Sequence, residues 1–348
     1  MKKVLALVLA LVLAFGVMTC GASAEAADYS DELYIMNVFV NNVEYWFPVY
    51  AGMKEACKLL GVNCEYSGTT EYDTQKQVES FNADVAKGPK GMVLSPIEEA
   101  AFVEPINAAI AQGISVVTYA SDSPESNRCA YVTSDNVNEG QSAARQLCEE
   151  VGSGSILVLR NPNQDNHNRR CDAFIAYVEA NYPDCKVVAD IPTEQDSQRG
   201  YDAVMTTYQN NPDLVGVFSP EGSSITGAAT AAAELNATGA NIRCCCVDTS
   251  DVLLEMLAAD QMFMLLCPDQ FTQGWVSMML CFGNAHPEVY VPMNERRGGV
   301  GETLMSVTVD NGLTQVTKDT AEYYYCAQYA KDLGYKDVAD MLSPYTVG

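Results

Sequence analysis

From Leu33 onward the sequence repeats one pattern, in which a short apolar run is followed by a helix with one apolar face. The run 114–118 carries Ile114, Val116 and Val117 and suits a strand that is buried on both faces. Strands that alternate with helices predict parallel sheets covered by helices. The roughly 320 residues that follow the N-terminal leader suggest two domains. We therefore predict an α/β fold of two doubly wound parallel-sheet lobes joined by a multi-strand hinge.

The pattern also predicts where the chain passes between the lobes. The expected strands are 33–40, 62–66, 92–94, 114–118 and 129–133 in the first lobe and 156–159, 186–191, 214–218, 242–247 and 262–267 in the second. The chain is expected to leave the first lobe through Ser134, Asp135 and Asn136 and to return in a helix that includes Leu280. The predicted division is an N-terminal lobe of 30–134 plus 270–297, a C-terminal lobe of 135–269 plus 298–315, and a helical tail of 316–348. Within the last part we expect a strand at 304–309 and a helix within 318–342.

The first residues are typical of a secretory signal peptide. Lys2 and Lys3 precede the apolar run 4–15, which is too short to span a membrane, and small residues follow. Two cleavage sites remain open: a lipoprotein-type site before Cys20, which would be lipidated, and an A-x-A site that ends the signal at residue 24. Either site predicts an extracytoplasmic protein, secreted or anchored to the cell envelope.

The charge of the chain limits its partners. The formal net charge is −25, and loss of the two leader lysines makes it −27 (−25 − 2). Such a surface repels nucleic acid and anionic membranes. We expect a monomer whose partner is small or locally basic.

The thirteen cysteines favour buried thiols over disulfides. Cys57 and Cys148 fall on apolar helix faces, and Cys244, Cys245 and Cys246 are consecutive in one expected strand. There is no C-x-x-C and there are only two histidines, so we expect no metal site. Mostly free thiols would suggest an oxygen-poor habitat.

The phosphate-binding, G-x-S-x-G and H-E-x-x-H motifs are also absent, so we expect neither a cofactor nor an enzyme.

Polar and aromatic residues gather where the expected strands end. In parallel sheets, ligands bind beyond the carboxyl ends of strands. The candidate residues are Asn41, Trp46, Ser95, Asp122, Asn166, His167, Arg170, Glu221, Asp248 and Asp269. Carboxylates, amides and an arginine suit sugar hydroxyls, which both donate and accept, while an aromatic face packs against the C–H side of the ring. Taken singly, Trp46 could be a core aromatic, Arg170 a solvated charge and Asp248 a helix cap.

Several segments carry a family resemblance that extends over nearly the whole chain after the leader. They are EYWFPVYAGMKEACKLLGV, GISVVTYASDSPESNR, TSDNVNEG, RRCDAF, NPDLVGVFSPEG, CVDTS and PDQFTQG. These segments resemble the substrate-binding proteins of bacterial sugar ABC transporters, in the ribose-binding and autoinducer-2-binding group with the type I periplasmic binding protein fold. The resemblance implies two lobes that close around a sugar and a closed form that docks on a membrane permease.

The resemblance also implies roles for individual residues. Trp46, with Asn41 nearby, matches an aromatic and Asn segment, and Arg170 matches the arginine that begins the second helix of the second lobe. Glu221 stands where the family has Asn or Asp, and Asp248 matches the Asp that follows the next strand. Three further residues match ligand positions of the autoinducer-2 type: Asn166, His167 and Asp269.

One departure bears on specificity. The family usually has an Asp directly after the strand at 114–118, where this chain has Ala120, and Asp122 lies two residues later. The Gln that is common near the last hinge is also absent. We therefore expect the ligand to be a modified or less hydroxylated relative of ribose. A sensory role, in which the protein presents its ligand to a chemoreceptor or sensor kinase, remains an alternative to transport.

Overall fold

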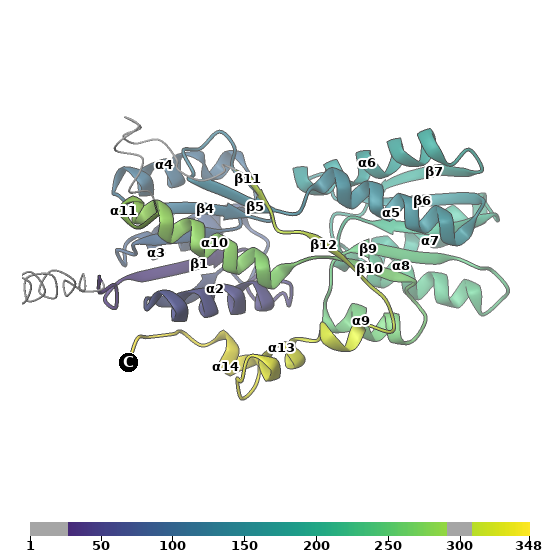
Figure 1. The fold of residues 1–348 in the computed structure, drawn as a ribbon. Coiled ribbons are helices and arrows are strands. Elements are labelled where there is room, and N and C mark those ends of the chain that lie inside the picture. Colours follow the sequence, from purple (N-terminus) through teal and green to yellow (C-terminus); the bar gives the residue numbers. More distant parts are fainter. Residues whose placement is uncertain (1–26, 291–307) are drawn as a thin grey trace, which may run out of the picture.

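The computed structural model describes residues 27–290 and 308–348, which form two α/β lobes joined by extended segments (Figure 1). Each lobe contains a six-stranded sheet with helices on both faces. The predicted fold class is thereby confirmed. In the described ranges, no helix combines the length and the apolar character needed to cross a membrane. The predicted signal peptide and Cys20 lie outside the described residues.

The first sheet is entirely parallel. Its strands, in spatial order, are β11 (Thr308–Asp310), β5 (Ala130–Thr133), β4 (Ser115–Tyr119), β3 (Gly91–Leu94), β1 (Leu33–Val38) and β2 (Asn63–Gly68). The helices of this lobe are α2 (Trp46–Leu60), α3 (Thr74–Val85), η1 (Ala100–Phe102), α4 (Val103–Ala111), α10 (Gln270–Ala285) and α11 (Pro287–Tyr290). Helix α10 returns from the second lobe, as predicted, and packs along α2 (Figure 1). Two glycines permit this approach, because a Cβ at Gly52 would lie 2.0 Å from the Phe271 carbonyl oxygen and one at Gly274 would lie 1.8 Å from that of Val49.

The second sheet repeats the scheme with one antiparallel edge strand. Its strands, in spatial order, are β12 (Leu313–Val316), β10 (Met264–Pro268), β9 (Arg243–Val247), β8 (Leu214–Ser219), β6 (Gly154–Arg160) and β7 (Cys185–Pro192). The helices are α5 (Asn136–Val151), α6 (Asp165–Asn181), α7 (Ser197–Asn210), α8 (Gly222–Asn236) and α9 (Asp251–Ala258). Helices α5 and α6 pack together, as do α7 and α8, over separate apolar clusters.

Three segments cross between the lobes: β5 to α5, β10 to α10, and β11 to β12. Asn311 ties them together, because its backbone N–H donates to the Thr133 carbonyl (3.3 Å) and its side-chain amide donates to the Asp269 carbonyl (3.1 Å). Gly312 follows with φ +88°, a left-handed conformation that favours glycine. The multi-strand hinge predicted from the sequence is therefore present.

Two details of the last part of the chain differ from the prediction. Strand β11 belongs to the first sheet, although 298–315 was assigned to the second lobe; the remainder of the expected strand at 304–309 lies outside the described residues. The tail is not one helix but η2 (Ala321–Tyr323), α13 (Cys326–Asp332) and α14 (Val338–Leu342), since Gly334 at φ +80° interrupts it.

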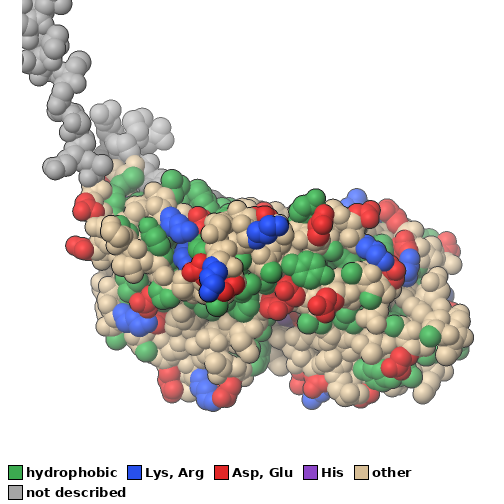
Figure 2. Space-filling view, turned by 90° about the horizontal axis from the view of Figure 1, so that it is seen from below, with side chains coloured by type: hydrophobic (Ala, Val, Ile, Leu, Met, Phe, Trp, Pro, Cys, Tyr) green, Lys and Arg blue, Asp and Glu red, His purple; other side chains and the backbone are tan. Residues whose placement is uncertain are grey.

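Within the tail, η2 packs against α9 of the second lobe, and α13 and α14 pack back onto the first lobe on the face that Figure 2 presents. The backbone of Tyr345 forms an antiparallel bridge with Cys64 in β2. The Lys54 ammonium donates to the backbone carbonyls of Asp340 (3.0 Å) and Ser343 (2.9 Å). Acidic side chains are spread over both lobes on this face (Figure 2).

All twelve described cysteines are free thiols, and all except Cys129 are buried. Burial raises the pKa of the Cys244 and Cys267 thiols to about 12, so these groups stay protonated.

Candidate ligand-binding site

A cavity of about 390 Å³ lies between the lobes, beyond the carboxyl ends of both sheets. We call it the inner cavity. The first lobe contributes Phe39, Val40, Val43, Tyr45, Trp46, Tyr72, Ser95, Ala120 and Ser121. The second contributes Asn161, Asn163, Gln164, Asn166, His167, Arg170, Glu194, Gln195, Glu221, Ser223, Val247 and Asp248. Among these described residues, every charged side chain comes from the second lobe.

Aromatic rings form the wall from the first lobe. Trp46 begins α2 and is only 5% exposed. It lies edge-on to Phe39 (ring centroids 5.2 Å apart) and to Tyr45 (4.9 Å), and its indole N–H donates to the Phe39 carbonyl (3.0 Å). Tyr72 lies edge-on to Phe39 at 5.7 Å. Edge-to-face packing holds these rings in fixed positions, and such a wall can cover the C–H face of a ligand ring.

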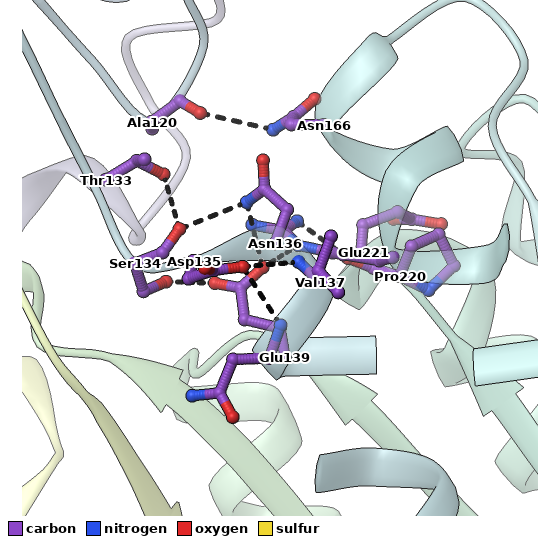
Figure 3. A network of polar contacts seen from close by, with 12 residues as sticks. Ala120, Thr133, Ser134, Asp135, Asn136, Val137, Glu139, Asn166, Pro220 and Glu221 are labelled. Atoms are coloured by element: carbon purple, nitrogen blue, oxygen red, sulfur yellow. Dashed lines mark hydrogen bonds and ion pairs between the residues drawn. The ribbon is translucent and has the colours of Figure 1, made fainter. Parts of the chain in front are cut away.

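Arg170 is held at the base of the opposite wall by a buried ion pair. Its Nε donates to Glu139, whose side chain is completely buried, and its Nη1 donates to the Pro220 carbonyl (3.0 Å). Glu139 also accepts from Ser134 and from the Asn136 amide (3.0 Å), so the network reaches the first hinge crossing (Figure 3). Arg170 has five N–H groups. Two of them are used within the described protein, which leaves three for a ligand.

Two carboxylates stand beside Arg170. Glu221 caps α8 and accepts from the backbone N–H of Ser224 (3.1 Å). Asp248 follows β9 and accepts from the backbone N–H of Gly222 (3.1 Å) and of Thr249 (2.7 Å). Burial, together with the negative charge of Glu221, raises the pKa of Asp248 to about 7, and burial also raises the pKa of Glu221. Each carboxylate accepts two backbone N–H groups and has lone pairs left, which can accept from ligand hydroxyls.

His167 remains neutral in this wall. Burial lowers its pKa well below the ordinary value, and the positive charge of Arg170 adds to the effect. Its Nδ1 lies 3.1 Å from the Asn161 amide nitrogen, which is a donor. The ring proton is therefore assigned to Nε2, and His167 can act as a neutral donor.

The structure brings together six of the predicted site residues: Trp46, Asn166, His167, Arg170, Glu221 and Asp248. Asn166 also reaches across to the first lobe, where its amide donates to the Ala120 carbonyl at 3.4 Å (Figure 3). Ser95, a further strand-end candidate, also lines the cavity.

Three predicted residues do not line the inner cavity. Asn41 is held in its own loop, where its amide donates to the Gly68 carbonyl (3.4 Å). Asp269 caps α10, accepting from the backbone N–H and the hydroxyl of Thr272 (3.0 and 2.7 Å). Asp122 is paired with Arg128 and accepts from the Thr118 hydroxyl (2.6 Å). The turn at Ala120, which has φ +58°, sends Asp122 toward Arg128 rather than into the inner cavity.

Several lining residues were missed. Glu194 and Gln195 follow β7 in a turn where both have positive φ, so the strand-end argument would have found them if it had been applied to that strand. Phe39, Tyr45 and Tyr72 carry no signal that separates them from core aromatics.

Comparisons with known proteins agree with this geometry. A profile of the periplasmic binding protein domain family matches residues 33–285. AraP, an arabinose binding protein from Geobacillus stearothermophilus, has a similar solved structure, with a TM-score of 0.78 and 29% identity over 85% of this chain and 99% of AraP. The D-allose-binding periplasmic protein of Escherichia coli is 25% identical over 236 residues, which are 64% of this chain and 74% of that protein. The xylose/arabinose-binding protein XylF of Sulfolobus acidocaldarius is 27% identical over 205 residues, so the match spans 55% of this chain but only 50% of XylF.

Proposed function

Because the chain belongs to the periplasmic binding protein family, we propose that it captures a small sugar or sugar-like ligand between its two lobes and delivers it to an ABC transporter permease. Membership in this family implies work outside the cytoplasm. The names of the similar proteins, which refer to arabinose, xylose and allose, support a sugar as the ligand.

The observation that carries the proposal is that the two lobes line the inner cavity with different kinds of side chain. One lobe presents aromatic rings packed edge to face, and the other presents an arginine, two carboxylates and amides across a three-segment hinge. In the proposed complex the ligand ring packs on Trp46, Arg170 donates to ring or hydroxyl oxygens, and Asp248 and Glu221 accept from hydroxyl groups. Asn166 and His167 add polar contacts to the same edge of the ligand.

We also propose that residues 1–24 are a cleaved signal peptide, or that cleavage occurs before Cys20 with lipidation of that residue. Mass spectrometry of the protein purified from its native membrane and culture medium separates the two. A mature chain that begins at Glu25 supports the first form, and an acylated Cys20 supports the second.

Binding is tested by a thermal-shift screen of the protein without its leader against pentoses, hexoses, polyols and furanones, followed by titration calorimetry. We expect at least one sugar to bind with a Kd in the micromolar range or below, about −8 kcal/mol or stronger. If no sugar binds to the folded protein, the proposal is wrong. Transport is tested by uptake of the labelled ligand into cells with and without this chain: loss of uptake at low ligand concentration supports delivery to a permease, and unchanged uptake contradicts it.

A further inference from the structure

A second cavity, of about 380 Å³, adjoins the inner cavity and shares Ser121, Asn163, Gln164 and Asn166 with it. We call it the outer chamber. Its own lining includes Glu98, Glu99, Ala100 and Asp122 from the first lobe and Asp165 and Arg169 from the second. Each cavity alone is near the lower end of the range of small-molecule sites, about 300–1,000 Å³. Together they provide room for a ligand longer than one ring.

Unpartnered polar atoms lie at the boundary between the two chambers. Gln164 is 5% exposed, and its Oε1 accepts from the amides of Asn161 and Gln195 (both 3.3 Å), which fixes the orientation of its own amide. Its Nε2 donates to no described protein atom. The Oδ1 of Asn166 is also buried without a described partner and points away from Ala120 (Figure 3). One donor and one acceptor are thus left over where the chambers meet, and buried polar groups normally have partners.

The outer chamber also brings together carboxyl groups of the two lobes. Glu99 and Asp165 come from opposite lobes and face each other across the cleft. Burial, with the negative charge of Asp165, raises the pKa of Glu99 to about 7. Glu99 and Asp165 share a hydrogen bond, with Arg169 nearby, and their remaining oxygens can accept from ligand hydroxyls.

Building on the proposed function, we infer that the ligand is an oligosaccharide of two linked sugar units. One ring lies in the inner cavity between Trp46 and Arg170, and the second lies in the outer chamber beside Glu99 and Asp165. The linkage passes Gln164 and Asn166, whose free donor and acceptor meet the oxygens and hydroxyls at the junction.

The test compares matched sugars by titration calorimetry on the protein without its leader: xylose with xylobiose, arabinose with arabinobiose, and galactose with galactobiose. We expect at least one two-unit sugar to bind about tenfold or more tightly than its single unit. The inference is overturned, while the proposed function survives, if single sugars bind and none gains affinity from the second unit. If neither kind of sugar binds, both proposals fall together.

Two substitutions in the outer chamber locate the second unit. Ala100 and Arg169 are exposed and do not line the inner cavity, so Ala100→Trp and Arg169→Ala should fold normally. Ala100→Trp narrows the chamber and should reduce the affinity for the two-unit sugar to that for the single unit, leaving the latter unchanged. Arg169→Ala should give a smaller loss in the same direction. Ala108→Trp, on the exposed side of α4, is the matched control and should change neither affinity. Equal effects of Ala100→Trp and Ala108→Trp would show that the second unit lies elsewhere.

Discussion

The ion pair between Glu139 and Arg170 gives the sharpest prediction, because it is the most buried pair of charges in the described chain. The Glu139 side chain is completely buried and that of Arg170 is 7% exposed. Removing one partner of a buried pair leaves an uncompensated charge and typically costs about 3–5 kcal/mol. Glu139→Gln keeps the volume and one acceptor oxygen, so we expect a loss of about 3 kcal/mol in the free energy of unfolding. Glu139→Ala also leaves Ser134 and Asn136 without their acceptor and should cost about 5 kcal/mol.

The assay is urea unfolding followed by two signals. Both tryptophans, Trp46 and Trp275, are in the first lobe, whereas the ion pair joins α5 and α6 in the second. Tryptophan fluorescence therefore reports on the first lobe, and far-ultraviolet circular dichroism reports on both. If the lobes unfold separately, the loss should appear in circular dichroism and be smaller in fluorescence.

Glu150→Gln is the matched control for this variant. Glu150 is on the same helix and pairs with Arg243, but both side chains are about one-third exposed (33% and 39%). Exposed pairs are worth about 0–1 kcal/mol, so this change should have little effect. Replacement of both buried charges, Glu139→Leu with Arg170→Met, should restore much of the stability and abolish ligand binding. A Glu139→Gln variant as stable as Glu150→Gln would refute the reasoning.

Four further predictions concern the ligand and pH. Arg170→Ala and Asp248→Ala should each weaken sugar binding roughly tenfold or more, since a charge-assisted hydrogen bond is worth about 1.5–3 kcal/mol; calorimetry with unchanged affinity in both would remove them from the site. Saturation with ligand should reduce the radius of gyration in small-angle scattering as the lobes close, and an unchanged value would count against closure. Ribose should bind weakly to the wild type and more tightly to Ala120→Asp, because the wild type lacks a first-lobe carboxylate for a hydroxyl pair; tight binding by the wild type would contradict this. The pKa of Asp248 is raised to about 7 in the folded state, so its protonation stabilises the fold fully below the unfolded pKa of about 4, and this stabilisation is lost as pH rises through 7. Asp248→Asn should therefore be about 1–3 kcal/mol more stable than the wild type at pH 8 and similar to it at pH 4. Thermal unfolding at each pH measures the difference.

The alternation of strands and helices was enough to predict the fold, including the return of α10 to the first lobe. The reason is physical: a parallel sheet covered by helices buries both faces of a run such as 114–118, and the alternation with helices supplies that cover. The family resemblance drawn from the sequence is likewise confirmed. The end of the chain was harder to predict, since a three-residue strand such as β11 carries no periodicity that assigns it to one sheet rather than the other.

The site was predicted only in part, because a strand end gives the position of a residue but not the direction of its side chain. Asp248 and Asp122 both follow strands of the sheets, yet Asp248 lines the inner cavity and Asp122 turns to Arg128. Arg128 is six residues further along the chain, beyond a turn whose geometry depends on Ala120. Glu139 was missed for a similar reason. It lies one turn inside a helix, where its sequence position is like that of any solvated glutamate, and only the approach of α6 brings Arg170 to it.

The first lobe has no carboxylate at Ala120, which in the proposed complex affects how the two lobes share recognition of the ligand. The first-lobe wall of the inner cavity contains no charged side chain among the described residues, while Arg170, Glu194, Glu221 and Asp248 all belong to the second lobe. In the proposed complex, charge-assisted hydrogen bonds to the ring in the inner cavity are therefore concentrated on the second lobe, and closure of the first lobe adds mainly aromatic contact and the exclusion of water. Because hydrogen bonds strengthen when water is excluded, the aromatic wall of the first lobe strengthens the hydrogen bonds that the second lobe makes to the ligand. It follows that substitution of Trp46 should weaken binding through the polar wall as well as through lost packing, so that the losses in Trp46→Ala and Arg170→Ala should not add in the double variant. Strict additivity of the two losses in calorimetry would show that the walls act independently.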